Sequence, residues 1–196
     1  AATGLSDTFS DLDLIIYHET PPYADQLATV RTTLQAIDVR VTWDHETQSA
    51  IEEYVLQGVE CQVAHIPIAK WERDMGAVFE DFEPATFVEK AIIGLMEGIA
   101  LHGSDVITQW QDRAASYPEA LARATVEHYL QFSPLWLTAE QWRTRDATIF
   151  FTQMLVEVSL NVLGVLAGLN RRYYSSFQFK RLHHFVSTLH LAPDRL

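Results

Sequence analysis

The sequence is poor in cysteine, in basic residues and in long apolar runs free of charge. Its single cysteine, Cys61, excludes a disulfide within the chain and fits a reducing compartment, so we expect a cytoplasmic protein. Because no stretch of about 18 uncharged apolar residues occurs, we expect no membrane-spanning segment. The most apolar stretch, residues 148–169, is interrupted by Gln153 and Glu157 and is typical of a buried helix in a soluble bundle.

Basic residues are outnumbered, with 14 Lys and Arg against 26 Asp and Glu and a formal net charge of −12. Proteins that grip a nucleic-acid backbone usually present a basic face, so we do not expect a nucleic-acid partner. The first basic side chain, Arg31, follows a series of acids. This end of the chain therefore favours a bound metal and a small cationic co-substrate. Alternatively, the acidic balance only keeps the protein soluble.

The first part of the chain combines alternating and helical patterns. Residues 11–17 alternate and then turn apolar, which predicts a strand, and Pro21 and Pro22 end it. Gln57 and Gly58 predict a tight turn between two strands. We expect strands at residues 11–17, 38–43, 53–56 and 59–66, a helix at 23–37, and a short helix at 70–82.

After Pro84 the pattern is helical throughout. Apolar residues recur at helical spacing in five segments, at residues 87–101, 105–116, 118–132, 145–169 and 177–189. The sequence therefore predicts an α+β protein. Residues 1–83 form a small mixed-sheet domain and residues 84–196 an all-helical bundle.

Chemistry is concentrated at Asp11 and Asp13. Side chains two residues apart on a strand face the same way, so these carboxylates lie side by side. A cation between them relieves their repulsion, and Mg²⁺ prefers hard oxygen ligands and leaves room for substrate phosphates. The pair is suited to carrying an NTP on one or two Mg²⁺ ions. The alternative is an exposed strand end with two solvated carboxylates.

The surroundings of this pair carry a resemblance. Gly4 is followed by Ser10-Asp11-Leu12-Asp13 and then by apolar strand residues. This segment resembles the signature of the DNA polymerase β-like nucleotidyltransferase superfamily, in which a Gly-Ser pair precedes the acidic motif. The resemblance implies that Gly4 and Ser10 bind nucleotide and that Asp11 and Asp13 bind metal. We expect the Gly-Ser pair and its strand to precede Ala1.

The same resemblance implies a third acid on a later strand, where it binds metal or accepts a proton from the acceptor hydroxyl. Glu60 and Gln62 share a face of the strand at 59–66, opposite Cys61 and Val63. Glu60 is the candidate catalytic and metal-binding acid. If the family position falls at Gln62, either the acid is lost or Glu60 replaces it.

The end of the chain also resembles a known group. Asn170-Arg171-Arg172-Tyr173-Tyr174, followed by Lys180, resembles the closing helices of kanamycin-type nucleotidyltransferases and of a related uncharacterised group with a helical C-terminal domain. The resemblance implies that Lys180 and either Arg171 or Arg172 contact nucleotide phosphates. Alternatively, these basic residues only stabilise a helix C-terminus. The histidines, His18 and His65 among them, show no spacing typical of metal ligands.

We therefore predict an enzyme that transfers a nucleoside monophosphate from an NTP, most simply ATP, to a hydroxyl of a small acceptor. The resemblance suggests an aminoglycoside-like acceptor. Two alternatives stay open. One is a degenerate nucleotide-binding regulatory module, which Gln62 favours, and the other is transfer to a protein or RNA. The sequence leaves a homodimer open as well.

Overall fold

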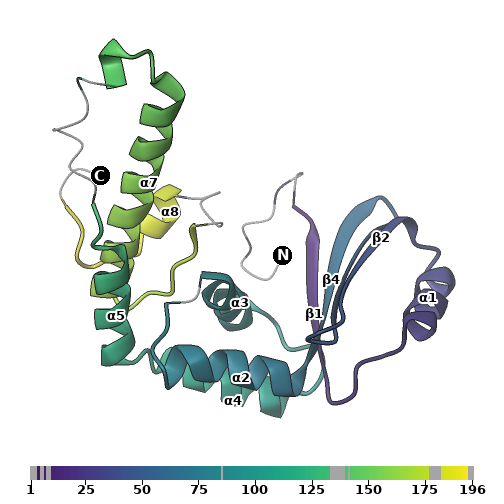
Figure 1. Ribbon diagram of the computed structural model, residues 1–196. Coiled ribbons are helices and arrows are strands. Elements are labelled where there is room, and N and C mark those ends of the chain that lie inside the picture. Colours follow the sequence, from purple (N-terminus) through teal and green to yellow (C-terminus); the bar gives the residue numbers. More distant parts are fainter. Residues whose placement is uncertain are drawn as a thin grey trace. The chain divides into compact units, whose positions relative to one another are not determined.

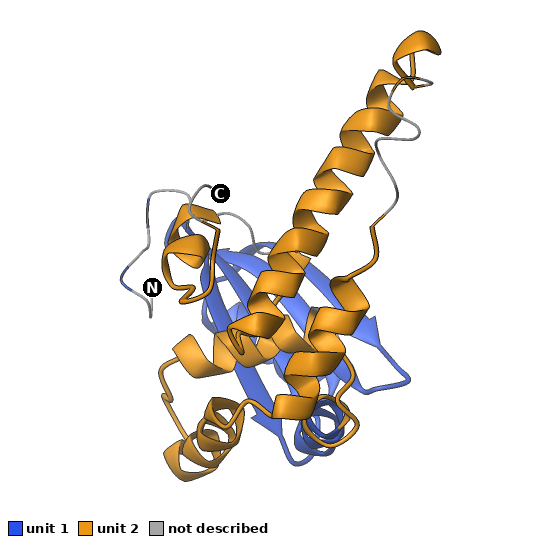
Figure 2. Cartoon of the chain, turned by 90° about the vertical axis from the view of Figure 1, so that its left-hand side faces the viewer, with its two compact units in different colours: residues 1–76 blue, residues 77–196 orange. Residues whose placement is uncertain are grey.

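The protein has an α+β fold with a four-stranded mixed sheet and several helices (Figure 1). The computed structural model describes residues 4, 7, 10–84, 86–132, 140, 142–176 and 182–193. The chain separates into two compact units, Ala1–Gly76 and Ala77–Leu196 (Figure 2). The predicted domain boundary, between residues 83 and 84, falls just beyond the end of the helix that crosses this division, and it stays a prediction.

The first unit holds the whole described sheet. Its elements are β1 (Leu12–His18), α1 (Ala24–Thr33), β2 (Ile37–Asp44), β3 (Ser49–Leu56), β4 (Val59–Pro67) and most of α2 (Ile68–Phe79). The strand order is β1-β4-β3-β2. β1 runs parallel to β4, whereas β3 pairs antiparallel with both β4 and β2. β1 is therefore an edge strand of the described sheet.

Three residues with a left-handed backbone conformation lie at the ends of these elements. Gln57 and Gly58 have φ angles of 51° and 83°, which confirms the tight turn predicted between β3 and β4. Gln35 also has a positive φ of 58°, just after α1 ends. The helix predicted to reach residue 37 is therefore too long. Ile37 is the first residue of β2. Its spacing from the apolar residues of α1 is helical only by coincidence.

Residues that alternate along the strands give the sheet two different faces. One face carries a cluster of Tyr54, Cys61 and Val63, against which Leu14 and Ile16 of β1 pack. α1 lies over this face, since Arg31 of α1 forms an ion pair with Glu52 of β3. The opposite face is covered at one end by α2. There the rings of Tyr17 and Trp71 have centroids 5.4 Å apart.

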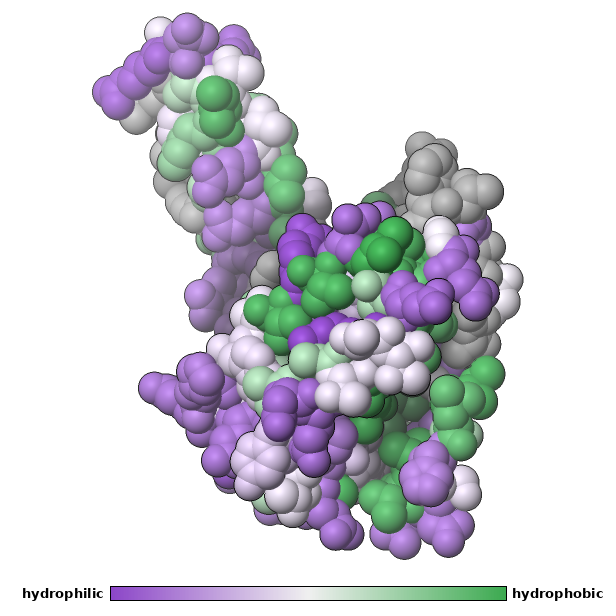
Figure 3. All heavy atoms as spheres, turned by 90° about the vertical axis from the view of Figure 1, so that its right-hand side faces the viewer, coloured by the Kyte–Doolittle hydropathy of each residue, from purple (hydrophilic) through white to green (hydrophobic). Residues whose placement is uncertain are grey.

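Some apolar side chains of the first unit stay exposed. They lie on α1 and β2 and include Val30, Leu34, Ile37 and Val39. Figure 3 views the chain from the side of these two elements and shows green apolar patches between purple polar ones. Single apolar residues of this kind are normal on a protein surface and indicate no partner by themselves.

The second unit is helical in its described residues. Its helices are α3 (Thr86–Glu97), α4 (Ser104–Ala115), α5 (Glu119–Tyr129), α7 (Thr148–Leu169) and α8 (Leu182–Ser187). α5 and α7 pack closely because α7 has glycines at the contact. A Cβ atom at Gly164 would lie 2.3 Å from Cγ of Tyr129. One at Gly168 would lie 2.9 Å from Cγ2 of Val126.

α7 is confirmed as a helix, but the prediction that it is buried is wrong for its first half. Leu163, Leu166 and Ala167 are buried near its end, whereas Ile149 is 86% exposed near its start. By length and composition alone, α7 could cross a membrane, and 17% of its most apolar window is buried. A buried core helix passes the same test. The expectation of no membrane span therefore stays a prediction.

Candidate carboxylate site on the sheet

A row of polar side chains crosses the sheet near the beginning of β1. Asp13 of β1 is opposite Gln62 of β4, and Gln62 is opposite Glu53 of β3. Glu53 is in turn opposite Arg40 of β2. Nε2 of Gln62 donates a hydrogen bond of 3.4 Å to Glu53, and Nε of Arg40 lies 3.1 Å from the other carboxylate oxygen of Glu53.

Asp11 directly precedes β1, and Glu60 is the second residue of β4. Leu12 is opposite Cys61, and the residues that precede these two are Asp11 and Glu60. Both carboxylates are exposed, as is that of Asp13. Glu60 and Gln62 are exposed and alternate with buried Cys61, which is the alternation that the sequence indicates. The arrangement leaves both candidates for the third acid open.

The position of α2 leaves this part of the sheet uncovered within the first unit. Asp13, Ile15 and Tyr17 share one face of β1 by strand alternation. α2 packs on this face through Trp71, which contacts Tyr17. Along β1, Leu12 and Asp13 are accordingly exposed, whereas the residues from Leu14 to His18 are half-buried. The carboxylates therefore lie on the open end of a face whose other end is packed.

Ser10 and Gly4 precede the carboxylates. The hydroxyl of Ser10 donates to Oδ1 of Asp7 at 3.0 Å and accepts from the backbone N–H of Asp7 at 2.9 Å. These contacts link Ser10, the residue directly before Asp11, to Asp7. Gly4 has a φ angle of 68°, in the region that favours glycine. Nothing tests the predicted contacts of Gly4 and Ser10 with nucleotide, which stay predictions.

Arg171 belongs to the second unit and is 61% exposed in its side chain, where it pairs with Glu119 of α5. The nearby residues Asn170 and Tyr174 form hydrogen bonds with distant parts of the chain. Oδ1 of Asn170 accepts hydrogen bonds of 2.8 Å from the backbone N–H groups of His190 and Leu191. The N–H of Tyr174 donates to the carboxylate of Glu89, which is fully buried in α3. Lys180 lies outside the described residues, so the predicted phosphate contacts of both basic residues stay untested.

The donor set of the first unit suits a hard cation. Carboxylate oxygens are the ligands that Mg²⁺ prefers, and such ions usually take one or two protein carboxylates and complete their shell with water and phosphate. Within the ranges that the structure describes, no three His, Cys, Asp or Glu side chains gather closely enough to hold a metal by themselves. Asp11 and Asp13 have the donor chemistry for a magnesium ion that a triphosphate also binds, and the binding itself stays a prediction.

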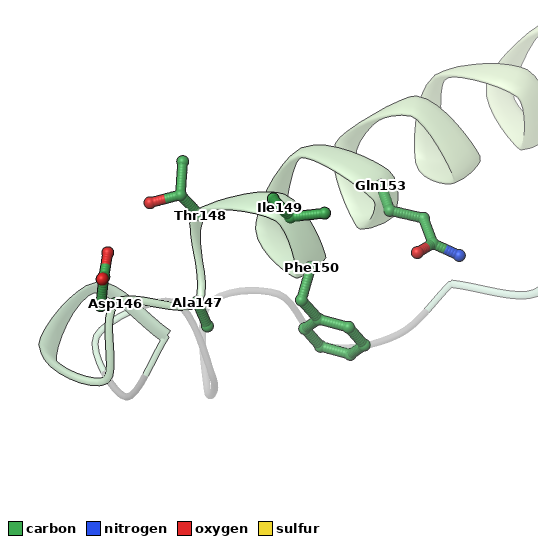
Figure 4. Close-up of a pocket in the computed structure, with 6 residues that line it drawn as sticks. All are labelled: Asp146, Ala147, Thr148, Ile149, Phe150 and Gln153. Carbon is green, nitrogen blue, oxygen red and sulfur yellow. The ribbon is translucent and has the colours of Figure 1, made fainter.

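A hollow on the described surface lies elsewhere. It is an open hollow of about 550 Å³ at the beginning of α7, lined by residues such as Asp146, Ile149 and Phe150. Figure 4 shows Asp146 and Gln153 at its two ends. Asp146 is the one carboxylate among its described lining residues, and the hollow is open to solvent.

The protein was compared with models of protein families, with curated proteins and with solved structures, and no match was found in any of the three.

Sequence reasoning missed two features of the first unit. Glu53 supplies a further carboxylate on the candidate face, and its strand position opposite Gln62 could have been found by extending the predicted hairpin. His18 and His65 are hydrogen-bonded to each other on the opposite face. Only the pairing of β1 with β4 brings these two residues together, and no local pattern signals it.

Proposed function

We propose that the protein is a Mg²⁺-dependent nucleotidyltransferase. It transfers a nucleoside monophosphate from an NTP, most simply ATP, to a hydroxyl of a small cationic acceptor such as an aminoglycoside. The finer architecture, a nucleotidyltransferase domain followed by a helical bundle, belongs to this proposal. The observation that carries it is Asp13, which is exposed at the open end of a sheet face and follows two residues after Asp11, the exposed residue directly before the same strand.

In this reaction the residues of the chain would have the following roles. Asp11 and Asp13 would hold the magnesium ion, which would supply positive charge to neutralise and orient the triphosphate. The acceptor oxygen attacks the α-phosphorus, the bond from this phosphorus to the bridging oxygen breaks, and pyrophosphate leaves. Glu60 accepts the proton of the acceptor hydroxyl or completes the metal site. The exposure of Glu60 leaves its carboxylate accessible to a substrate.

The net charge supports the small cationic acceptor. The chain carries a formal net charge of −12, and the candidate face presents the carboxylates of Glu53 and Glu60 besides the two aspartates. An acidic surface attracts cations and repels nucleic acid. A polycationic hydroxyl compound therefore suits this face better than RNA does.

The second candidate function is nucleotide binding without turnover. The observation that favours it is Gln62, because this uncharged side chain occupies the strand position directly opposite Asp13. An amide cannot accept the proton of an attacking hydroxyl. In this case the protein binds an NTP with Mg²⁺ and serves a regulatory role.

The test is release of pyrophosphate from ATP and Mg²⁺ across a panel of hydroxyl acceptors that includes aminoglycosides. We expect release with at least one acceptor, and Asp13→Asn should lower it by about 100-fold or more, because the metal contributes several kcal/mol to the reaction. Asp112→Asn, an exposed aspartate in α4, is the matched control and should leave the rate unchanged. NTP binding without release across the panel would favour the regulatory alternative, and full activity of Asp13→Asn would end the assignment.

A further inference from the structure

A chain of polar side chains crosses the sheet on the face opposite Asp13. Nε2 of His18 and Nδ1 of His65 are 2.9 Å apart, and their rings are stacked. Nε2 of His65 lies 3.1 Å from one carboxylate oxygen of Glu52, and the other oxygen accepts a hydrogen bond from Arg31. These contacts link β1, β4, β3 and α1 in that order.

The inner part of this chain is shielded from water. His65 is 5% exposed and Glu52 is 3% exposed, whereas His18 is half-buried. A buried carboxylate keeps its charge when a cation and hydrogen bonds compensate it, and Arg31 supplies both. The charged Glu52 then holds a hydrogen on Nε2 of His65. In neutral His65, Nδ1 therefore accepts a hydrogen bond, and Nε2–H of His18 donates it.

The number of protons on the pair decides whether this bond exists. When both rings are neutral, His18 donates to His65. When the pair holds one additional proton, a single hydrogen still lies between the two nitrogens. When both rings are protonated, each of the facing nitrogens carries a hydrogen, and the bond is replaced by repulsion between two cations.

The surroundings of His18 oppose its protonation. Burial lowers the pKa of His18, and the charge of His65 lowers it further. The charged groups beside the pair are Glu52 from β3, which contacts His65, and Arg31 from α1, which pairs with Glu52. Arg31 and Glu52 neutralise each other as an ion pair. The pair therefore has no net negative charge to stabilise two imidazolium rings.

The lowered pKa of His18 determines how the stability of the fold changes with pH. The unfolded chain takes up a proton on His18 at the ordinary value of about 6.5, before the folded chain does. The stability contributed by the neutral ring is therefore complete above that pH and is lost as the pH falls toward the lowered pKa. Acidification thus weakens the attachment of β1 once both rings are protonated, and β1 has β4 as its one strand partner in the described sheet.

We infer that the hydrogen bond between His18 and His65 is a pH-sensitive tie that holds β1, and with it Asp13, on the sheet. His18 is the last residue of β1, and Asp13 lies near the beginning of this strand. Loosening the strand changes the separation of Asp13 from β4. The effect on metal binding rests on the proposed function, whereas the tie itself does not.

Hydrogen exchange of the backbone amides in the full chain tests the tie. After correction for intrinsic rates, protection of β1 amides relative to β3 amides should fall about threefold to tenfold between about pH 7.5 and the acid end of the pH range in which the chain stays folded, the effect of one lost hydrogen bond. His18→Gln keeps a neutral donor in place and should abolish this fall. His45→Gln, in the exposed β2–β3 turn, is the matched control and should behave like the parent chain.

The inference is overturned if β1 and β3 lose protection in parallel, or if His18→Gln retains the fall. Binding of Mn²⁺, followed by its paramagnetic effect on water relaxation, tests the consequence for the site. The Mn²⁺ Kd should rise more steeply on acidification in the parent chain than in His18→Gln, and equal slopes would overturn the coupling. If neither chain binds Mn²⁺ near neutral pH, the proposed function fails, while the exchange experiment still decides on the tie.

Discussion

Asp13 of β1 lies directly opposite Gln62 of β4, in a parallel pair at the open end of one sheet face. An acid at the second position would provide a ready ligand for a divalent ion, and an amide provides a weaker one. Gln62 instead donates its amide hydrogen to Glu53. The amide of Gln62 opposite Asp13 is the feature of the described chain that bears most directly on the choice between a catalyst and a binding module.

The variant Gln62→Glu probes this position. It places a carboxylate opposite Asp13, so we expect the affinity for Mn²⁺ to rise about tenfold. Without metal, the lost hydrogen bond to Glu53 and the repulsion between facing acids should lower stability by about 0.5–1 kcal/mol. Titration with Mn²⁺ and thermal unfolding with and without Mg²⁺ measure the two effects. Unchanged metal affinity would show that residue 62 does not face the metal.

Alanine substitutions at two helix glycines, one inside the contact between α5 and α7 and one outside it, should have opposite effects on stability. Gly164→Ala should destabilise the protein by about 1–3 kcal/mol, because the new methyl group meets the ring of Tyr129. Gly94→Ala, in α3, meets nothing within 4 Å and should stabilise it by about 0.5–1 kcal/mol. Urea unfolding followed by circular dichroism measures both. Equal effects of the two variants would contradict the packing of α5 on α7.

Two adjacent glutamates on β3 should differ strongly in their contribution to stability. Glu52→Gln leaves Arg31 without its charge partner in a mostly buried place, and we expect a loss of about 2–4 kcal/mol. Glu53→Gln breaks an exposed pair with Arg40 and should cost less than about 1 kcal/mol. Chemical denaturation near neutral pH compares the two. A similar small loss in both would mean that Glu52 is not buried beneath α1.

Much of the first unit follows from local sequence rules. Alternation predicted the strands, and Gly58 marked the turn that its positive φ confirms. Alternation also separates Glu60 and Gln62 from Cys61, as the burial of β4 shows. These features depend on neighbours within one strand, so a single stretch of sequence contains the necessary information.

Other features depend on contacts between distant residues. His18 and His65 are 47 residues apart in the chain, and their bond requires the parallel pairing of β1 with β4. The exposure of Ile149 depends on how far α5 extends along α7, which the composition of α7 does not contain. Local hydrophobicity predicts that a helix forms, whereas its burial is decided by the elements that pack against it.

The most direct test of the account is the location of a bound divalent ion. Mn²⁺ added with a non-hydrolysable ATP analogue should broaden the amide resonances of residues 12–14 in β1 and 61–63 in β4. Asp13→Asn should abolish this broadening, and Asp112→Asn should not. Broadening that is confined to other parts of the chain, or that persists in Asp13→Asn, would contradict the claim that Asp11 and Asp13 hold the metal.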